Sequence, residues 1–238
     1  MANIRNTGPK EGLVPGISCN GPSPHWNARK LDAVSTQEID EEFDRERPDA
    51  RLQWWNPPRR ADLRESRLVV ATRGGSDFWQ RTHYGFRRDD GHCLLCEWRG
   101  GDFALTTKVH VHPVHQYDQA GLIVRFSADC WLKTSVEYEP DRPNRLGAVV
   151  TNAGWSDWST QDVPHSLDGI QLRVRRAHRA YVVEVAPADG DVSSWSQIRL
   201  AHLGEDDGGP VQCGLYACGP TGEGFIAEFD YIRLSGRF

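Results

Sequence analysis

Hydrophobic and polar side chains alternate with a period of two along four segments of the chain, and this pattern constrains the fold most strongly. The segments are 103–112, 131–139, 170–175 and 225–232. A period of two is that of a β-strand with one buried face. No helical pattern of comparable length separates the segments, which disfavours a parallel sheet with crossover helices. The sequence therefore predicts an all-β fold of short antiparallel strands arranged as a two-sheet sandwich.

Length and composition favour one domain of this kind. The chain has 238 residues, 38% of them hydrophobic, and nine tryptophans, which is enough to build one continuous core. A net charge of −5 offers no positive field to a nucleic acid, so none is expected as a partner. No stretch is apolar and long enough for a signal peptide or a membrane span. We expect a cytoplasmic protein, without membrane contact, whose six cysteines are reduced.

The first fifty residues differ from the rest and predict an arm. Residues 6–24 are rich in Gly, Pro, Ser and Asn, with few spaced apolar side chains. Ser35 and Glu38 form a capping box at the start of a segment that runs to Phe43, which predicts one short helix. The run Trp54-Trp55-Asn56-Pro57-Pro58 then ends any regular element. The predicted domains are an arm over 1–51 and a sandwich over 52–238.

One polar face of the segment 131–139 contains a candidate site. Lys133 and Glu137 lie on the same side of the predicted strand, with Trp131 at its end. A lysine near a carboxylate could bind an anionic ligand or set the protonation state of the carboxylate for acid/base work. The alternative is a solvated ion pair of little energetic weight.

A second group of polar residues precedes Gly121. Tyr117, Asp118 and Gln119 offer a hydroxyl, a carboxylate and an amide, which can hydrogen-bond a polyhydroxylated ligand in several directions. The alternative is a turn in which these side chains bond neighbouring backbone groups. The strand that follows carries Arg125, which we add to the ligand-binding candidates.

Three histidines form the pattern His110-x-His112-Pro-Val-His115. Side chains two apart on a strand point the same way, as a metal site on a sheet requires, but no carboxylate follows at a recognisable spacing. We therefore predict no metal site, and we keep His110 and His112 as ligand-binding candidates and His115 as a candidate for proton transfer. The chain also lacks a glycine-rich phosphate loop and a nucleophile elbow, so no cofactor is expected.

A third group surrounds Gly154. Trp155 and Trp158 follow it, and an exposed indole of this kind could stack on the apolar face of a sugar while Asn152 and Asp157 hydrogen-bond its hydroxyls. Trp158 and Ser159 are added to the ligand-binding candidates. The alternative is that the tryptophans here close one end of the hydrophobic core.

Ordered short motifs extend from residue 52 to the C-terminus. They are Trp55-Asn-Pro-Pro58, Asp77-Phe-Trp79, Thr82-His-Tyr-Gly-Phe86, Gly91-His92, Gly101-Asp-Phe103, Tyr117-Asp-Gln-Ala-Gly-Leu122, Trp131-Leu-Lys-Thr134 with Glu137, Ser156-Asp-Trp-Ser159, Gly222-Glu-Gly-Phe225 and Glu228-Phe-Asp-Tyr231. Together they resemble the uncharacterised concanavalin A-like family that includes the fungal regulation-of-enolase protein. This resemblance implies a jelly-roll sandwich with one concave face, generally in cytosolic proteins, and no established activity. The arm falls outside it, and could cover the concave face, form a homodimer or have no role.

Three functions are compatible with these observations. The first is the binding of a small polar or carbohydrate-like ligand on the concave face. The second is an acid/base enzyme without a cofactor, an isomerase, lyase, hydratase or cyclase, in which Glu137, Lys133 and His115 are catalytic. The third is a regulatory protein-binding module, which only the name of one family member suggests. The sequence leaves open whether the protein is an enzyme.

Overall fold

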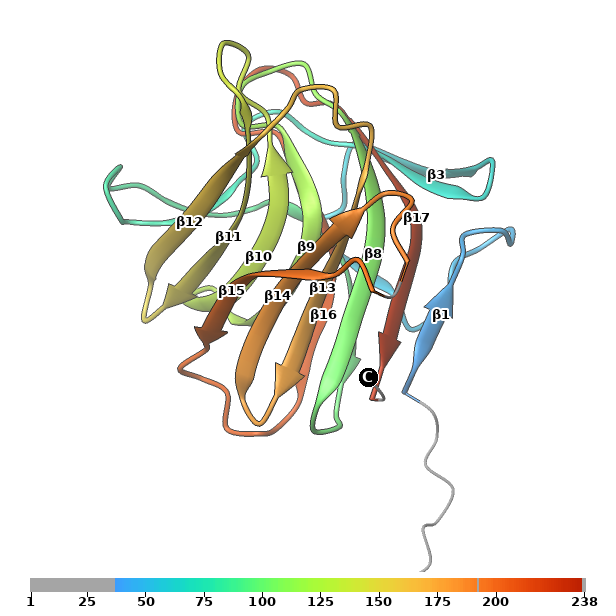
Figure 1. Ribbon diagram of the computed structural model, residues 1–238, viewed down its shortest axis with the longest axis vertical. Coiled ribbons are helices and arrows are strands. Elements are labelled where there is room, and N and C mark those ends of the chain that lie inside the picture. Colours follow the sequence, from blue (N-terminus) through green and yellow to red (C-terminus); the bar gives the residue numbers. More distant parts are fainter. Residues whose placement is uncertain (1–36, 192, 237–238) are drawn as a thin grey trace, which may run out of the picture. The chain divides into compact units, whose positions relative to one another are not determined.

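The computed structural model describes residues 37–191 and 193–236, and within these ranges the chain forms strands and no helices (Figure 1). Two large sheets stack as a sandwich, and every pair of named strands is antiparallel. The predicted all-β, two-sheet sandwich is thereby confirmed. Among the described residues, no helix is long and apolar enough to cross a membrane.

The first sheet has eight strands. They are β1 (Ile39–Glu41), β3 (Arg60–Arg64), β4 (Arg67–Ala71), β8 (Phe103–His112), β13 (Ile170–Ala177), β14 (Ala180–Pro187), β15 (Ser196–His202) and β17 (Ile226–Ser235). Their order is β15-β14-β13-β8-β17-β4-β3, with β1 also paired to β17.

The second sheet has seven strands, and a separate hairpin completes the fold. The seven are β2 (Gln53–Trp55), β7 (His92–Trp98), β9 (Gln119–Ser127), β10 (Cys130–Glu137), β11 (Asn144–Asn152), β12 (Trp155–Val163) and β16 (Val211–Cys218), in the order β12-β11-β10-β9-β16-β7-β2. The hairpin is β5 (Phe78–Gln80) with β6 (Arg87–Asp89).

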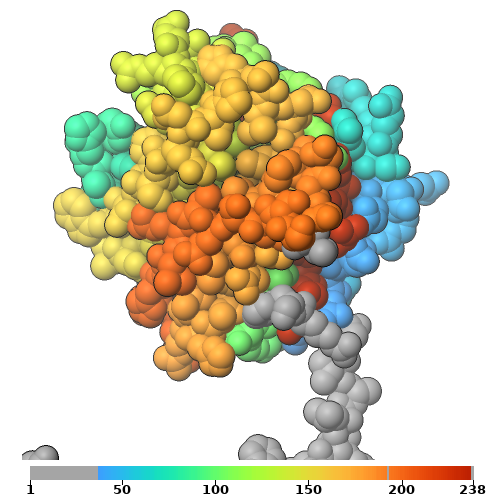
Figure 2. Space-filling view, in the orientation of Figure 1, coloured from blue at the N-terminus to red at the C-terminus, as the bar shows by residue number. Residues whose placement is uncertain are grey.

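The main core lies between the two large sheets. Inward positions of the period-two segments, such as Leu105, Leu132, Leu172 and Phe229, are buried there. In Figure 2, the side chains of β14 and β15 (orange) form a continuous face next to those of β12 (yellow). The edges of the two sheets therefore meet along these strands, where side chains of β12 and β15 form an ion pair.

The seven-stranded sheet is covered on its outer face as well. The hairpin β5–β6 packs there and forms a second apolar cluster, which contains Phe78, Trp79, Cys93, Leu95, Ile123, Trp131, Val149, Tyr216 and Cys218. The ring of Phe78 meets the rings of Trp131 at 5.8 Å and Tyr216 at 6.1 Å between centroids. Part of this outer face is therefore a second core and not an open surface, and the rest of the face remains for a site.

The predicted short N-terminal helix is wrong over the residues that the structure describes. Residues 35 and 36 of that segment lie outside the described residues, and Ile39–Glu41 is strand β1. Ile39 and Glu41 point inward and are buried, while Asp40 and Glu42 are exposed, which is the period of a strand. The ladder with β17 and the burial of Ile39 override the local preference for a helix. Residues 37–51, which we assigned to the arm, thus pack on the sandwich.

Candidate functional site

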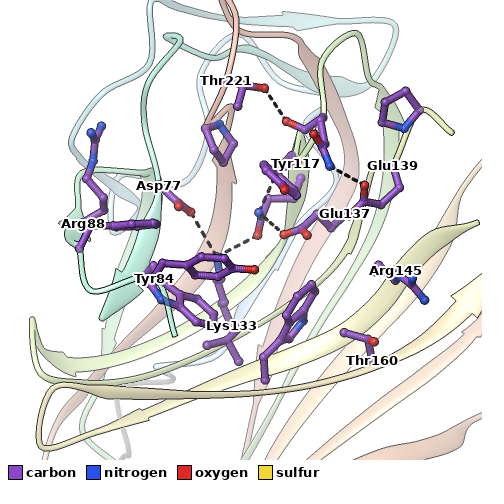
Figure 3. Close-up of a pocket in the computed structure, with 18 of the residues that line it drawn as sticks. Asp77, Tyr84, Arg88, Tyr117, Lys133, Glu137, Glu139, Arg145, Thr160 and Thr221 are labelled. Carbon is purple, nitrogen blue, oxygen red and sulfur yellow. Dashed lines mark hydrogen bonds and ion pairs between the residues drawn. The ribbon is translucent and has the colours of Figure 1, made fainter. Parts of the chain in front are cut away.

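A pocket of about 1020 Å³ opens on the outer face of the seven-stranded sheet, beside the hairpin β5–β6 (Figure 3). Its floor is formed by β9 and β10, one wall by β11 and β12, and the opposite wall by the hairpin and the segment before it. Gln119 and Glu137 are direct cross-strand neighbours at the ends of β9 and β10. Lys133 lies four residues before Glu137 on the same face of β10, so the pairing of these strands brings all three side chains together.

Gln119 connects the charged groups of the floor. Its Oε1 accepts hydrogen bonds from the ammonium of Lys133 at 2.9 Å and the hydroxyl of Tyr216 at 3.1 Å. Its Nε2 donates to Oε2 of Glu137 at 2.7 Å and to the backbone carbonyl of Tyr117 at 3.1 Å. Lysine can only donate, which fixes the orientation of the amide. All four hydrogen-bonding positions of the amide are then filled, and it is held rigidly.

Lys133 is a buried ammonium, with only 3% of its surface exposed. Its Nζ lies 3.6 Å from Oδ1 of Asp77, the residue that immediately precedes β5. The same atom lies 5.9 Å from the ring centre of Trp131 and 5.7 Å from that of Tyr216. One carboxylate, one amide oxygen and two aromatic faces thus surround the cation, which stabilises its charge inside the protein.

Glu137 lies at the inner end of the pocket, in contact with protein on most sides and with the pocket on one. Burial raises the pKa of this carboxyl from 4.5 to about 8, against the opposing effect of the nearby Lys133, and the charges of Asp77 and Glu139 add to the rise. At neutral pH the carboxyl is therefore mostly protonated. A carboxylic acid with a pKa near the working pH is suited to exchange protons with a bound molecule.

Aromatic side chains form the walls above this floor. Trp158 of β12 is 36% exposed, and its ring meets that of Trp79 in β5 at 6.4 Å between centroids. Tyr84, in the hairpin turn, packs against Trp79 at 5.5 Å and against Phe86 at 5.9 Å. Tyr84 and Phe86 are among the exposed large aromatic residues of the described chain. The sequence patterns did not select Asp77, Tyr84 or Phe86, although they lie in motifs that carry the family resemblance.

Charged residues at the mouth of the pocket are mostly paired. Arg88 pairs with Asp90 at 2.9 Å, and Arg145 pairs with Asp162 across β11 and β12. Arg142 also lines the mouth. The mouth therefore mixes both signs of charge and has no strong field of one sign.

The structure brings five of the predicted site residues to this pocket: Tyr117, Gln119, Lys133, Glu137 and Trp158. The alternation of the segment 131–139 and the family resemblance together predicted that these residues share one surface. Whether a ligand occupies the hollow stays a prediction.

Three other predicted residues lie near the pocket but do not line it. Trp131 is completely buried in the second apolar cluster, so its ring supports Lys133 from below and has no surface for stacking on a ligand. Asp118 is also buried, and its Oδ2 accepts the backbone N–H groups of Val114 and His115, as the alternative of a turn predicts. Arg125 is likewise held by protein groups. It pairs with Asp89 of β6 at 2.8 Å and stacks on Trp55 at 4.3 Å, fixing the hairpin to the sheet.

The three histidines do not reach the pocket. His110 and His112 lie on β8, in the other sheet, where they face Asp230 at 3.1 Å and Glu228 at 3.4 Å. The ring of His115 lies against Gly222 and does not line the pocket. None of the three is therefore placed to act on a ligand there. Among the described residues, no group of three or more His, Cys, Asp and Glu side chains could hold a metal ion.

The remaining candidates lie around β12 but outside the pocket. The side chain of Asn152 accepts the N–H of Gly204 at 2.7 Å and donates to the carbonyl of His202 at 2.9 Å, so it connects two loops. Asp157 pairs with Arg199 of β15 at 2.8 Å. Ser159 shares the face of Asp157 because strand positions alternate, and Trp158 points the other way.

Comparison with known proteins identifies relatives of the whole sandwich. Regulation of enolase protein 1 of Saccharomyces cerevisiae is 34% identical over 182 residues, which is 76% of this chain and 88% of that protein. A solved structure of a functionally unknown protein from Saccharomyces cerevisiae is 31% identical, with a TM-score of 0.71 over 79% of this chain and 98% of that one.

More distant structures share the fold. The GH43 protein BlXynB of Bacillus licheniformis has a TM-score of 0.66 at 16% identity, over 90% of this chain and 41% of that one. At this identity the likeness shows the jelly-roll sandwich alone. The predicted resemblance is confirmed at the level of the family: the model of the family described as "Protein of unknown function (DUF1349)" matches residues 54–237, and this chain belongs to that family.

Proposed function

We propose that this protein binds a small polyhydroxylated ligand, of the carbohydrate class, in the pocket between β12 and the hairpin β5–β6. One observation carries the proposal: exposed aromatic side chains stand over a rigid floor of hydrogen-bonding groups within a single pocket. The pocket volume of about 1020 Å³ is at the upper end of the roughly 300–1,000 Å³ typical of small-molecule sites.

The two kinds of surface suit the two sides of a sugar. The apolar C–H face of a pyranose can stack on the indole of Trp158 or on the ring of Tyr84. The hydroxyl groups at its edge need donors and acceptors in fixed positions, which Lys133, Glu137 and Asp77 supply. Gln119 holds Lys133 and Glu137 in one arrangement before a ligand binds. Binding therefore loses little conformational entropy of these side chains.

The jelly-roll fold shared with part of a GH43 protein agrees with this ligand class. The name GH43 applies to that protein and not to this chain. For this chain, the proposed ligand class is argued from the residues that line the pocket.

A matched pair of tryptophans on one strand tests the proposal. Trp158 lines the pocket, whereas Trp155 of the same strand is 58% exposed and does not line it. Calorimetric titration with a panel of mono- and disaccharides should identify a ligand whose affinity falls about 10-fold or more in Trp158→Ala, from the loss of buried apolar contact. The Trp155→Ala variant should bind like the unmodified protein. Equal losses in the two variants, or no binding by any saccharide, would count against the proposal.

A second candidate function, catalysis, is favoured by one specific observation. The pKa of Glu137, at about 8, lets this carboxyl both release and accept a proton near neutral pH, and Lys133 nearby can stabilise a developing anion. The chain would then be an acid/base enzyme that needs no cofactor.

Hydrogen exchange distinguishes catalysis from binding alone. An enzyme of this kind should exchange a carbon-bound hydrogen of its ligand with deuterium from the solvent. We expect Glu137→Gln to abolish this exchange while the ligand still binds. Exchange that persists unchanged in Glu137→Gln would remove Glu137 as the acid/base group, and absence of exchange in the unmodified protein would leave binding as the function.

A further inference from the structure

The floor of the pocket has more donors than its own acceptors satisfy. The ammonium of Lys133 carries three N–H groups. One is donated to Gln119, and Asp77 faces the cation at 3.6 Å, which is longer than a hydrogen bond. Its other close neighbours are the rings of Trp131 and Tyr216. Lys133 is also one of the residues that line the pocket.

Glu137 adds a donor to the same floor. The fixed amide of Gln119 donates to Oε2, so Oε2 must act as the acceptor. With a pKa of about 8, the carboxyl carries a proton at neutral pH, and the contact with Gln119 leaves Oε1 available to hold it. Glu137 then acts as an O–H donor and not as an anion. Asp77, in the wall beside the floor, keeps the role of acceptor.

The other charged residues of the pocket are compatible with a bound anion. Glu139 accepts a hydrogen bond from Gln116 at 2.8 Å, and Asp141 is exposed at the mouth. Arg142 also lies at the mouth, and no described residue forms an ion pair or side-chain hydrogen bond with its guanidinium. A ligand carboxylate would therefore meet one free arginine at the mouth and two donors at the floor.

We propose that the preferred ligand is a sugar acid, whose carboxylate binds to the ammonium of Lys133 and the O–H of Glu137, and whose hydroxyl groups donate to Asp77. A carboxylate only accepts hydrogen bonds, so it complements the donors that the floor leaves unused. A neutral sugar offers only hydroxyl groups to a buried cation. This inference rests on the proposed function, because it names the ligand class of the same pocket.

Matched pairs of sugars test it directly. D-glucuronate and D-glucose, D-galacturonate and D-galactose, and D-mannuronate and D-mannose differ in whether C6 is a carboxylate. In calorimetric titrations at pH 7, the acid of at least one pair should bind about 10-fold or more tightly than its neutral partner, as expected for a charge-assisted hydrogen bond away from water.

Two lysine variants give the matched control. Lys133→Met should remove the preference for the acid, whereas Lys108→Met, on the other sheet beside Asp230, should keep it. A second measurement covers the case in which Lys133→Met does not fold. In the unmodified protein, affinity for the acid should fall between pH 7 and pH 9 as Glu137 becomes an anion, while affinity for the neutral partner should change little.

The possible failures are distinguishable. Neutral sugars that bind as tightly as their acids would overturn the sugar-acid inference and leave carbohydrate binding in place. If neither class binds, both the proposed function and this inference are overturned.

Discussion

Gln119 forms hydrogen bonds to both ionisable groups on the pocket floor. Its amide oxygen is bound to Lys133 and its amide nitrogen to Glu137, so the two charges are separated by a neutral group and do not meet. A direct salt bridge would hold the carboxyl ionised. With the amide between them, burial dominates and the carboxyl of Glu137 stays protonated near neutral pH. Burial thus makes this glutamate a proton donor, against the opposing effects of Lys133 and of the hydrogen bond from Gln119.

This arrangement should reduce stability, and Glu137→Gln tests that expectation. The folded protein holds the Glu137 proton up to a pKa of about 8, whereas the unfolded chain releases it near 4.5. Because the folded state binds more protons between these values, the free energy of unfolding falls as pH rises from 4.5 to 8. Glutamine has no such proton. Urea unfolding should find Glu137→Gln more stable at pH 8 by several kcal/mol, since each unit by which the pKa is raised corresponds to about 1.4 kcal/mol, with the difference shrinking towards pH 4.5. A difference that does not vary with pH would contradict the assigned pKa.

Period-two alternation predicted part of the site from the sequence. Alternation placed Lys133 and Glu137 on one face of β10, and the structure shows both at the pocket. The same alternation placed Trp131 on that face, yet Trp131 is buried. Alternation predicts the face of the strand on which a side chain lies. It does not predict whether another part of the chain packs on that face. The covering ring of Phe78 comes from a hairpin about fifty residues earlier in the chain.

The hairpin β5–β6 is the element that separates the second apolar cluster from the site on the outer face of the seven-stranded sheet. Its Phe78 and Trp79 fill the second apolar cluster, and its turn carries Tyr84 and Phe86 to the pocket wall. Arg125 attaches it to the sheet through Asp89. Hairpins this short are marginal alone and depend on such packing. The same element therefore buries part of the face and shapes what remains.

Strand β1 shows why the N-terminal helix prediction failed. The capping box and helix-forming residues around Glu38 are local signals, each of small energy. In β17, the residue that pairs with Ile39 is Leu234, almost two hundred residues later in the chain. A local sequence pattern cannot predict such a contact or the burial of Ile39 that accompanies it. Glu41 would be an exposed acid in a helix. In the strand its carboxylate accepts backbone N–H groups of Phe43 at 2.8 Å and Asp49 at 2.7 Å.

The contacts of Glu41 predict a large difference between two adjacent glutamates. Glu41→Ala removes a buried carboxylate and leaves two backbone donors without their acceptor, so it should lower the free energy of unfolding by about 1–3 kcal/mol. Glu42→Ala removes an exposed ion pair with Arg233 and should cost less than about 1 kcal/mol. Chemical denaturation of both variants measures the two values. Equal costs would mean that Glu41 does not hold the β1 segment on the sandwich.

At the scale of the whole molecule, the order of strands is determined by contacts far apart in the sequence. The C-terminal strand β17 lies inside the eight-stranded sheet, between β8 and β4, and β9 pairs with both β10 and β16. The alternating pattern predicted the strands and the sandwich, because it reports burial on one face. It could not predict the neighbours of each strand, since many pairings bury the same faces.

This topology predicts opposite effects for truncation at the two ends. The two apolar clusters draw their buried residues from positions 39 to 234 of the chain. Removal of residues 1–36 should therefore leave the thermal midpoint within about 5 °C of that of the full chain, which for a domain of this size corresponds to a change of no more than roughly 2 kcal/mol. Removal of residues 226–238 should abolish cooperative unfolding, because it takes β17 out of the sheet.

Differential scanning calorimetry of both truncated chains checks this expectation. Sedimentation of the full chain and of the chain without residues 1–36 tests whether the arm forms a homodimer. If the arm forms a homodimer, the full chain sediments as a dimer and the chain from residue 37 as a monomer, with pocket binding retained in both. A large loss of midpoint without residues 1–36 would show that the stability of the sandwich depends on more than the contacts among residues 39 to 234, and the two apolar clusters would then not be its complete core.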